Sequence, residues 1–307
     1  MRRLLFLTGA IILVDTLFFA ALTPLLPHYA HSLGLGKGGA GVLSAAYPAG
    51  ALFGSIPSGI VAARLGVKPT VLAGMTVVAI TTALFGFAGA AWELDLARFC
   101  QGIASSFSWT GALAWLVAAA PPGRRGRLIG QAFAAAVGGA LLGPVLGGIA
   151  SITGTRWAFG AVAVASLGVA VWAALTPAAR PEKAPQRLGT LLHAVRDPRI
   201  AVGVWFVTLP ALLFGTLGVL APLRLAALGF GAVAIGAVWL AAGALETVNN
   251  LLLGRFSDRF GPLAPIRVAL VATIVVACAL PWPKERFLLA AVIVCAGLAF
   301  GAFCTPG

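Results

Sequence analysis

Long apolar stretches alternate with short polar ones along almost the whole chain. Ten apolar stretches are about 18–25 residues long, the length that a helix needs to cross roughly 30 Å of hydrocarbon. They cover approximately residues 4–26, 40–62, 70–91, 95–118, 128–150, 157–176, 200–221, 233–253, 264–282 and 287–306. The buried strands of a soluble α/β protein would be much shorter, at about five to eight residues. The pattern therefore predicts an all-α membrane protein with ten spans.

Composition and the distribution of charge agree with this prediction. Hydrophobic residues are 60% of the chain and charged residues only 9%, against about 25% charged in globular proteins. The net charge of +13 could suit a nucleic-acid partner, but most of the 21 Lys and Arg residues lie at the N-terminus and in alternate loops. This is the positive-inside pattern. We therefore expect a multi-pass protein of the cell (inner or plasma) membrane with a cytoplasmic N-terminus, in contact with lipid and not with nucleic acid.

The N-terminus and the cysteines each allow a second interpretation. The first residues resemble the start of a secretory signal peptide, but Asp15 interrupts the apolar run, which is also too long for a cleaved peptide. We interpret it as an uncleaved first span. The four cysteines all lie in predicted spans without metal-ligand spacing, so we expect neither a metal site nor a disulfide framework.

The second part of the chain repeats the first. Pro27 and Arg64 match Pro222 and Arg259, which lie 195 positions further on. Six spans separate the two copies, so the copies run parallel, as in transporters built from two parallel repeats.

The repeat divides the chain into three parts. We expect an N-terminal six-helix bundle over 1–176, a polar cytoplasmic linker over 177–199 and a C-terminal bundle over 200–307. The C-terminal part holds four of the six helices that a full repeat would have. We therefore expect a chain that is truncated at its C-terminus, with about ten spans of twelve.

The fifth span carries an unusual number of helix-breaking residues. Its pattern is G-x-x-x-G-P-x-x-G-G, formed by Gly139, Gly143, Pro144, Gly147 and Gly148. In a soluble helix each Gly would cost about 1 kcal/mol and Pro about 3 kcal/mol. In a bilayer, small residues instead let two helices pack backbone to backbone. We predict a kinked helix where two rigid bundles meet and move.

A few ionisable residues lie at membrane depth in the predicted spans, which makes them functional candidates. Asp15 is ~16 Å from either membrane surface at 1.5 Å per residue, where a carboxylate needs a partner or a proton. It could carry a proton or bind a cationic substrate, or it could be a protonated group that only bonds a neighbouring helix. Arg98 needs carbonyl groups, water or an acid, and Asp15 is the acid we expect. Alternatively, Arg98 extends toward the outer membrane surface and has no role in coupling.

Glu246 is the third ionisable residue, in the eighth span. Asn249 and Asn250 follow it at i+3 and i+4, on the same stripe of the helix. We expect these side chains to face a central cavity and to take part in cation recognition or proton exchange. A structural hydrogen-bond cluster is the alternative.

Several motifs together resemble the major facilitator superfamily, in its drug–proton antiporter branch. They are the glycine-proline pattern of the fifth span, Asp15 followed by Pro24 and Pro27, and the element Arg98-x-x-Gln101-Gly102. The sequence around these motifs is similar to that of bacterial multidrug exporters and vesicular amine transporters. Gly254-x-x-x-Asp258-Arg259-x-Gly261, between spans eight and nine, matches a loop motif of the superfamily. The first-half copy has Gly59, Arg64 and Gly66, with Ala63 in place of the expected Asp.

The resemblance implies a fold, a mechanism and roles for residues. It implies two bundles that rock around a midplane site, and it assigns Arg98 to proton coupling. The loop motifs would form contacts that break when access changes, more weakly in the first half because Ala63 is not an anion; Arg64 could instead be only a positive-inside anchor. The function implied is proton-coupled efflux of small drug-like or cationic amphipathic compounds. We expect no enzymatic activity, no cofactor other than the proton gradient, and a monomer whose partners are the substrate and protons.

Two other functions stay open at this point. The chain could transport a sugar or another neutral metabolite, although its spans contain few Asn and Gln residues. It could also be a truncated membrane protein that does not transport.

Overall fold

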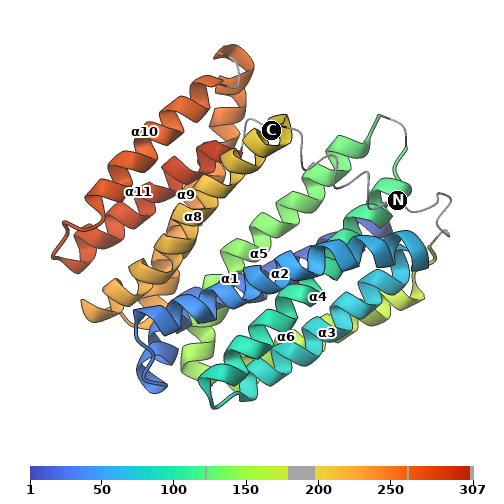
Figure 1. The fold of residues 1–307 in the computed structure, drawn as a ribbon, viewed down its shortest axis with the longest axis horizontal. Helices are drawn as coiled ribbons and strands as arrows, with labels where there is room; N and C mark the ends of the chain where they lie inside the picture. The colour runs from blue at the N-terminus through green and yellow to red at the C-terminus, as the bar shows by residue number, and fades with distance from the viewer. Residues whose placement is uncertain (122, 179–197, 261–262, 305–307) are drawn as a thin grey trace.

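The computed structural model describes residues 1–121, 123–178, 198–260 and 263–304. This part of the chain forms ten α-helices and no strands (Figure 1). They are α1 (Arg2–Ser32), α2 (Lys37–Leu65), α3 (Val67–Phe87), α4 (Ala91–Ala118), α5 (Arg125–Thr153), α6 (Thr155–Leu175), α8 (Pro198–Ala227), α9 (Ala232–Phe260), α10 (Leu263–Ala279) and α11 (Arg286–Cys304). The all-α prediction is therefore confirmed, with one helix for each of the ten apolar stretches.

Many of the helices are longer than the apolar stretches that predicted them. α1 continues through Pro24 and Pro27 to Ser32, and α9 continues to Phe260. The loop motif expected between spans eight and nine therefore begins in the last turns of α9, because helix geometry can continue beyond the hydrocarbon core into the headgroup region. Within the described residues, six helices are long and apolar enough to span a membrane.

The helices form two groups (Figure 1). α1–α6 pack together around two apolar clusters, one centred on Phe18, Phe85 and Phe159 and one on Ile11, Met75 and Trp115. α8, α9 and α11 share a smaller cluster that includes Leu225 and Ile293. The groups touch mainly through α5 and α9, with further contacts of α1 and α2 to α8. The boundaries of the predicted linker stay a prediction, because 179–197 lie outside the described residues.

One helix contact occurs once in each group at equivalent positions. Gly102 of α4 faces the carbonyl oxygen of Tyr47 in α2, and Gly297 of α11 faces the carbonyl oxygen of Ala242 in α9. Both residues of the second pair lie 195 positions after those of the first. At each place a Cβ on the glycine would overlap the carbonyl group. The sequence repeat is thus also a repeat of packing.

The glycines of α5 face two neighbours. A Cβ on Gly139, Gly143 or Gly147 would overlap the backbone of α1. Gly148 instead faces Val233 of α9, and the carbonyl oxygen of Pro144 lies against Gly236 of α9. α5 therefore contacts α9 of the second group, but most of its glycines serve the contact with α1 inside the first group.

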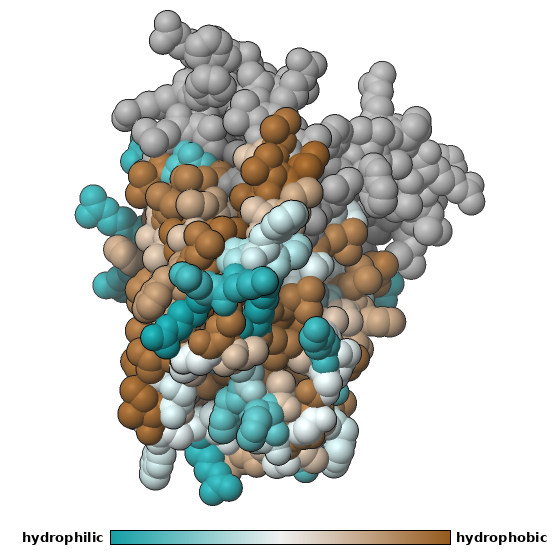
Figure 2. All heavy atoms as spheres, turned by 90° about the vertical axis from the view of Figure 1, so that its left-hand side faces the viewer, coloured by the Kyte–Doolittle hydropathy of each residue, from teal (hydrophilic) through white to brown (hydrophobic). Residues whose placement is uncertain are grey.

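Large apolar side chains cover the outside of the molecule. Leu52, Phe53 and Ile152 are among the most exposed, with Leu52 and Ile152 each at 75% exposure. Figure 2 shows one face, on which apolar residues predominate and hydrophilic residues are scattered. An apolar exterior is what a lipid environment requires of a helical membrane protein.

Candidate functional site

The carboxyl group of Asp15 is enclosed in the first helical group. The residue lies midway along α1 and is only 1% exposed. Its Oδ2 atom accepts hydrogen bonds from the Tyr47 hydroxyl at 2.9 Å, the Ser105 hydroxyl at 2.6 Å and the Trp109 indole nitrogen at 2.9 Å. Tyr47 comes from α2 and the other two donors from α4, so three helices build this site.

The second carboxyl oxygen of Asp15 has a different environment. Oδ1 is buried and has no hydrogen-bond partner among the residues that the structure describes. A buried polar atom without a partner costs free energy, and more so when it carries part of a charge. A carboxyl group with one oxygen held by three donors and the other unpaired is suited to exchange a proton or to bind a cation.

Arg98 is also enclosed, at 1% exposure. Its guanidinium donates at 3.3 Å to the side-chain oxygen of Gln101 and at 3.3 Å to the carbonyl oxygen of Phe19. Four aromatic rings surround it, with centroids between 5.1 and 5.9 Å from the central carbon: Phe18, Phe19, Tyr47 and Phe85. Rings at this distance stabilise a desolvated cation by about 2 kcal/mol or more.

Tyr47 links the acid to the base. We expected Asp15 to pair directly with Arg98, but among the described contacts the two are joined only through this tyrosine. Its hydroxyl bonds Asp15, and its ring lies 5.1 Å from the Arg98 guanidinium carbon. The carboxyl group of Asp15 thus contacts polar donors, whereas the guanidinium group of Arg98 contacts aromatic rings and two neutral oxygens.

The sequence contained a signal for part of this site. Arg98, Gln101, Ser105 and Ser108 recur at intervals of three or four residues, which places them on one face of α4. The predicted site included the first two residues but not Ser105, although this stripe of polar residues in an apolar span would have found it. Tyr47 is different, because nothing in the sequence indicates that α2 places it between α1 and α4.

Glu246 belongs to the other helical group. It is half-buried on α9, and no described contact joins it to Asp15 or Arg98. Asn249, one turn further along, donates a hydrogen bond at 2.7 Å to the carbonyl oxygen of Leu298 in α11. That bond fits the structural alternative for Asn249. The side chain of Asn250 lies outside the described residues.

The candidate gating residues outside α5 lie at helix ends. Gly59 and the exposed Arg64 are in the last turns of α2. Gly66 connects α2 to α3 with a φ of 98°, a conformation that favours glycine. In the second-half motif, Gly254, Asp258 and Arg259 belong to α9, but their contacts lie outside the described part of the chain, as does the whole of Gly261.

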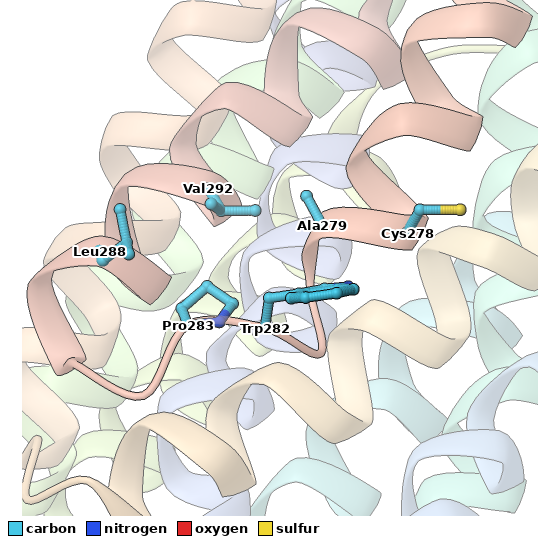
Figure 3. Close-up of a pocket in the computed structure, with 6 residues that line it drawn as sticks. All are labelled: Cys278, Ala279, Trp282, Pro283, Leu288 and Val292. Atoms are coloured by element: carbon cyan, nitrogen blue, oxygen red, sulfur yellow. The ribbon is translucent and has the colours of Figure 1, made fainter.

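Two hollows lie near the turn that joins α10 to α11. One, of about 480 Å³, is apolar and open, and its lining includes Cys278, Trp282 and Val292 (Figure 3). The other, of about 590 Å³, lies between α2, α8, α10 and α11 and has Lys37 and Arg224 at its edge. Arg224 bonds the carbonyl oxygens of Leu280, Pro281 and Pro283 and so holds the turn. The described lining of the two hollows contains no acidic residue.

The described residues contain no group of three or more His, Cys, Asp or Glu side chains placed to hold a metal ion. The candidate site is therefore the cluster around Asp15 and Arg98, which offers a protonatable acid, a fixed cation and aromatic faces.

Comparison with protein families and curated proteins gives a consistent result. A model of the Major Facilitator Superfamily matches residues 8–307. The chain is 33% identical over 105 residues to the MFS-type transporter ppzB of Metarhizium rileyi (strain RCEF 4871), a match of 34% of this chain and 22% of that protein. It is 29% identical over 215 residues to the probable vesicular acetylcholine transporter-B of Danio rerio (66% and 44%). It is 26% identical over 273 residues to Multidrug resistance protein 1 of Bacillus subtilis (strain 168) (85% and 70%). The first two matches span less than half of those relatives.

Solved structures share the fold. A bacterial homologue of the human lysosomal transporter Spinster, in an inward-facing and unoccupied conformation, aligns with a TM-score of 0.77 at 16% identity over 99% of this chain and 73% of that one. The nucleoside transporter NupG aligns with a TM-score of 0.78 at 17% identity, over 99% and 81%. At these identities the likeness concerns the fold alone.

Proposed function

Because this chain belongs to the Major Facilitator Superfamily, whose members are transporters rather than enzymes, we propose that it exports small cationic, amphipathic compounds in exchange for protons. Membrane transport of a small molecule follows from the family. The substrate class, the direction and the proton coupling are our proposals.

The observation that carries the proposal is the buried carboxyl group of Asp15. Its Oδ2 atom accepts hydrogen bonds from three donors, whereas Oδ1 has no partner in the described part of the chain. A carboxyl group at this depth can be neutralised by a proton or by the positive charge of a substrate, but a single buried site does not favour both at once. Competition of this kind couples the two fluxes in opposite directions.

The surroundings of Asp15 favour an organic cation. The indole ring of Trp109 and the ring of Tyr47 lie beside the carboxyl group, and aromatic faces attract cations as well as apolar surface. Arg98, held nearby as a permanent cation, would disfavour a substrate charge that is not balanced by ionised Asp15. Relatives named for acetylcholine and for multidrug resistance support this class of substrate.

Alternating access would use the contacts between the two helical groups. α5 meets α9 through Gly148 and the Pro144 carbonyl, and small residues allow such a contact to slide or part at low cost. We assign the second-half Asp258–Arg259 motif and its first-half counterpart at Arg64 to the end of the helices opposite this contact, which would be the cytoplasmic end. We further propose that the protein acts as a monomer in the cell membrane with its N-terminus in the cytoplasm.

Ethidium efflux from energised cells that express this protein tests the proposal. We expect efflux that a protonophore abolishes and that Asp15→Asn reduces at least roughly tenfold, the effect of about 1.4 kcal/mol on the rate. Glu285→Gln is the control, because Glu285 is an exposed carboxylate before α11, in the other helical group. Efflux that survives in Asp15→Asn would remove Asp15 from the coupling.

A neutral polar metabolite is the second candidate substrate. Gln101 and Thr82 bond one another at 3.3 Å beside the site, and amide and hydroxyl groups of this kind bind sugars or nucleosides. Competition between ethidium and a series of organic cations distinguishes the two candidates, since a carrier of neutral solutes would be insensitive to these cations.

A further inference from the structure

Three oxygen atoms of the Asp15 site form a closed triangle. The Tyr47 hydroxyl lies 2.9 Å from Asp15 Oδ2 and 2.6 Å from the Ser105 hydroxyl, and the Ser105 hydroxyl lies 2.6 Å from the same Oδ2 atom. All three separations are ordinary for O–H···O hydrogen bonds. The three residues come from α2, α4 and α1, and all are buried.

The number of hydrogens available decides which form of Asp15 fits this triangle. Tyr47 and Ser105 each carry one hydroxyl hydrogen, and an ionised carboxylate carries none. With Asp15 ionised, two hydrogens would serve three contacts, so one pair of oxygens would face each other at hydrogen-bond distance with no hydrogen between them. With one proton on Oδ2, each contact holds a hydrogen.

The complete ring runs in one direction. Tyr47 donates to Ser105, Ser105 donates to Asp15 Oδ2, and the proton on Oδ2 is donated to Tyr47. Trp109 donates to Oδ2 from outside the ring. The second oxygen, Oδ1, is then the carbonyl oxygen of a neutral acid, and its lack of a partner costs less than it would for a carboxylate.

The charged groups around the ring do not provide a competing explanation. α4 contributes Arg98, which acts on Asp15 only through space, and α2 contributes Tyr47 itself. α5 meets this part of α1 through Gly139 and Gly143. Thus, within the described residues, no second acid is available to share the proton.

We propose that this structure is the proton-loaded form of the carrier, and that Tyr47 and Ser105 are positioning residues that hold the proton on Asp15. The proposal rests on the proton-carrying role given to Asp15 above. When the proton leaves for water, the carboxylate keeps the electron pair of the O–H bond, and the contact between Tyr47 and Asp15 Oδ2 loses its hydrogen. The oxygens then repel one another, and because the Tyr47 ring also lies against Arg98, the loss of the proton is transmitted to α2 and α4.

Infrared spectroscopy of the purified protein in lipid nanodiscs at neutral pH tests this without a substrate. A protonated carboxyl group has a C=O stretching band well apart from the bands of carboxylates. We expect wild type to show such a band and Asp15→Asn to lack it. Tyr47→Phe and Ser105→Ala each remove one member of the ring, and we expect both to shift the band or abolish it.

Tyr29→Phe is the matched control, since Tyr29 is the other tyrosine of the chain, is buried, and packs against Phe85 outside the ring. We expect it to leave the band unchanged. Labelling wild type with ¹³C-aspartate gives the same assignment without a mutation, so a misfolded Asp15→Asn protein would not prevent the test.

Two results would overturn the proposal: a wild-type spectrum without an aspartic acid band, or a band that Tyr47→Phe and Ser105→Ala shift no more than Tyr29→Phe does. Neither result depends on transport. A correct band pattern in a protein that does not export ethidium would leave the ring intact and refute only the proposed function.

Discussion

The two helical groups share a packing frame, meaning equivalent glycine contacts between helices, but they differ in the side chains at matching positions. Gly102 meets Tyr47 in the first group as Gly297 meets Ala242 in the second. At the positions 195 residues after Asp15, Tyr47 and Arg98, the second half has Pro210, Ala242 and Ile293. Ile293 is buried in the apolar cluster of its group. The same frame therefore holds an acid and a base in one copy and only apolar groups in the other.

The second group has an acid of its own at an unrelated position. Glu246 aligns with Ala51 of the first half, and it is half-buried where Asp15 is fully enclosed. The glycine contacts preserve how the helices pack, whereas the side chains between them are free to diverge. We therefore predict that coupling depends more on the first group than on the second.

The largest effect is expected at Arg98. Arg98→Lys keeps the charge but loses the planar group that bonds Gln101 and the Phe19 carbonyl and stacks on four rings. Hydrogen bonds to charged groups contribute about 1.5–3 kcal/mol each. Their loss therefore predicts that the rate of ethidium efflux falls roughly ten- to a hundredfold. Arg156→Lys is the control, because Arg156 stacks on one ring, that of Phe87, within the described residues. Equal effects of the two substitutions would mean that the enclosure of Arg98 is irrelevant to transport.

The shared frame can be tested through its glycines. Gly102→Ala and Gly297→Ala each place a methyl group against a backbone carbonyl, and overpacking of this kind costs about 1–3 kcal/mol. We expect both to lower the midpoint of thermal unfolding in detergent. Gly168→Ala in α6, where the added carbon meets open space, should raise the midpoint slightly, by the helix propensity gained. If only Gly102→Ala destabilises the protein, the packing of the two groups is not equivalent.

A smaller effect is expected at Glu246. Glu246→Gln removes a charge that is half exposed and lies apart from Asp15 and Arg98, so we expect the ethidium concentration for half-maximal efflux to rise only about two- to fivefold, or up to ~1 kcal/mol. The exposed Glu285→Gln serves as the control. Abolished efflux in Glu246→Gln would reverse the comparison and make the second group the site of coupling.

Much of the architecture could be predicted because it follows from local composition. Ten apolar stretches each give a helix, since a chain in lipid has to satisfy its backbone hydrogen bonds within the segment. The length of each helix was less predictable, as α9 shows by continuing to Phe260, because the hydrocarbon thickness does not fix where a helix stops. The functional importance of Asp15 and Arg98 stays a prediction, which rests on the cost of burying a charge.

The helices, the repeat and the identity of the buried charges can be inferred from the sequence alone, because they depend on residues close together along the chain or on a fixed offset. Which groups contact one another depends on the tertiary structure. It placed Tyr47, from a different helix, between Asp15 and Arg98, where we had expected a direct ion pair, and it gave most of the α5 glycines to α1. These contacts depend on how far each helix is rotated about its axis and how closely its neighbour approaches, and the hydrophobic pattern of a segment that is apolar on every side does not encode that rotation.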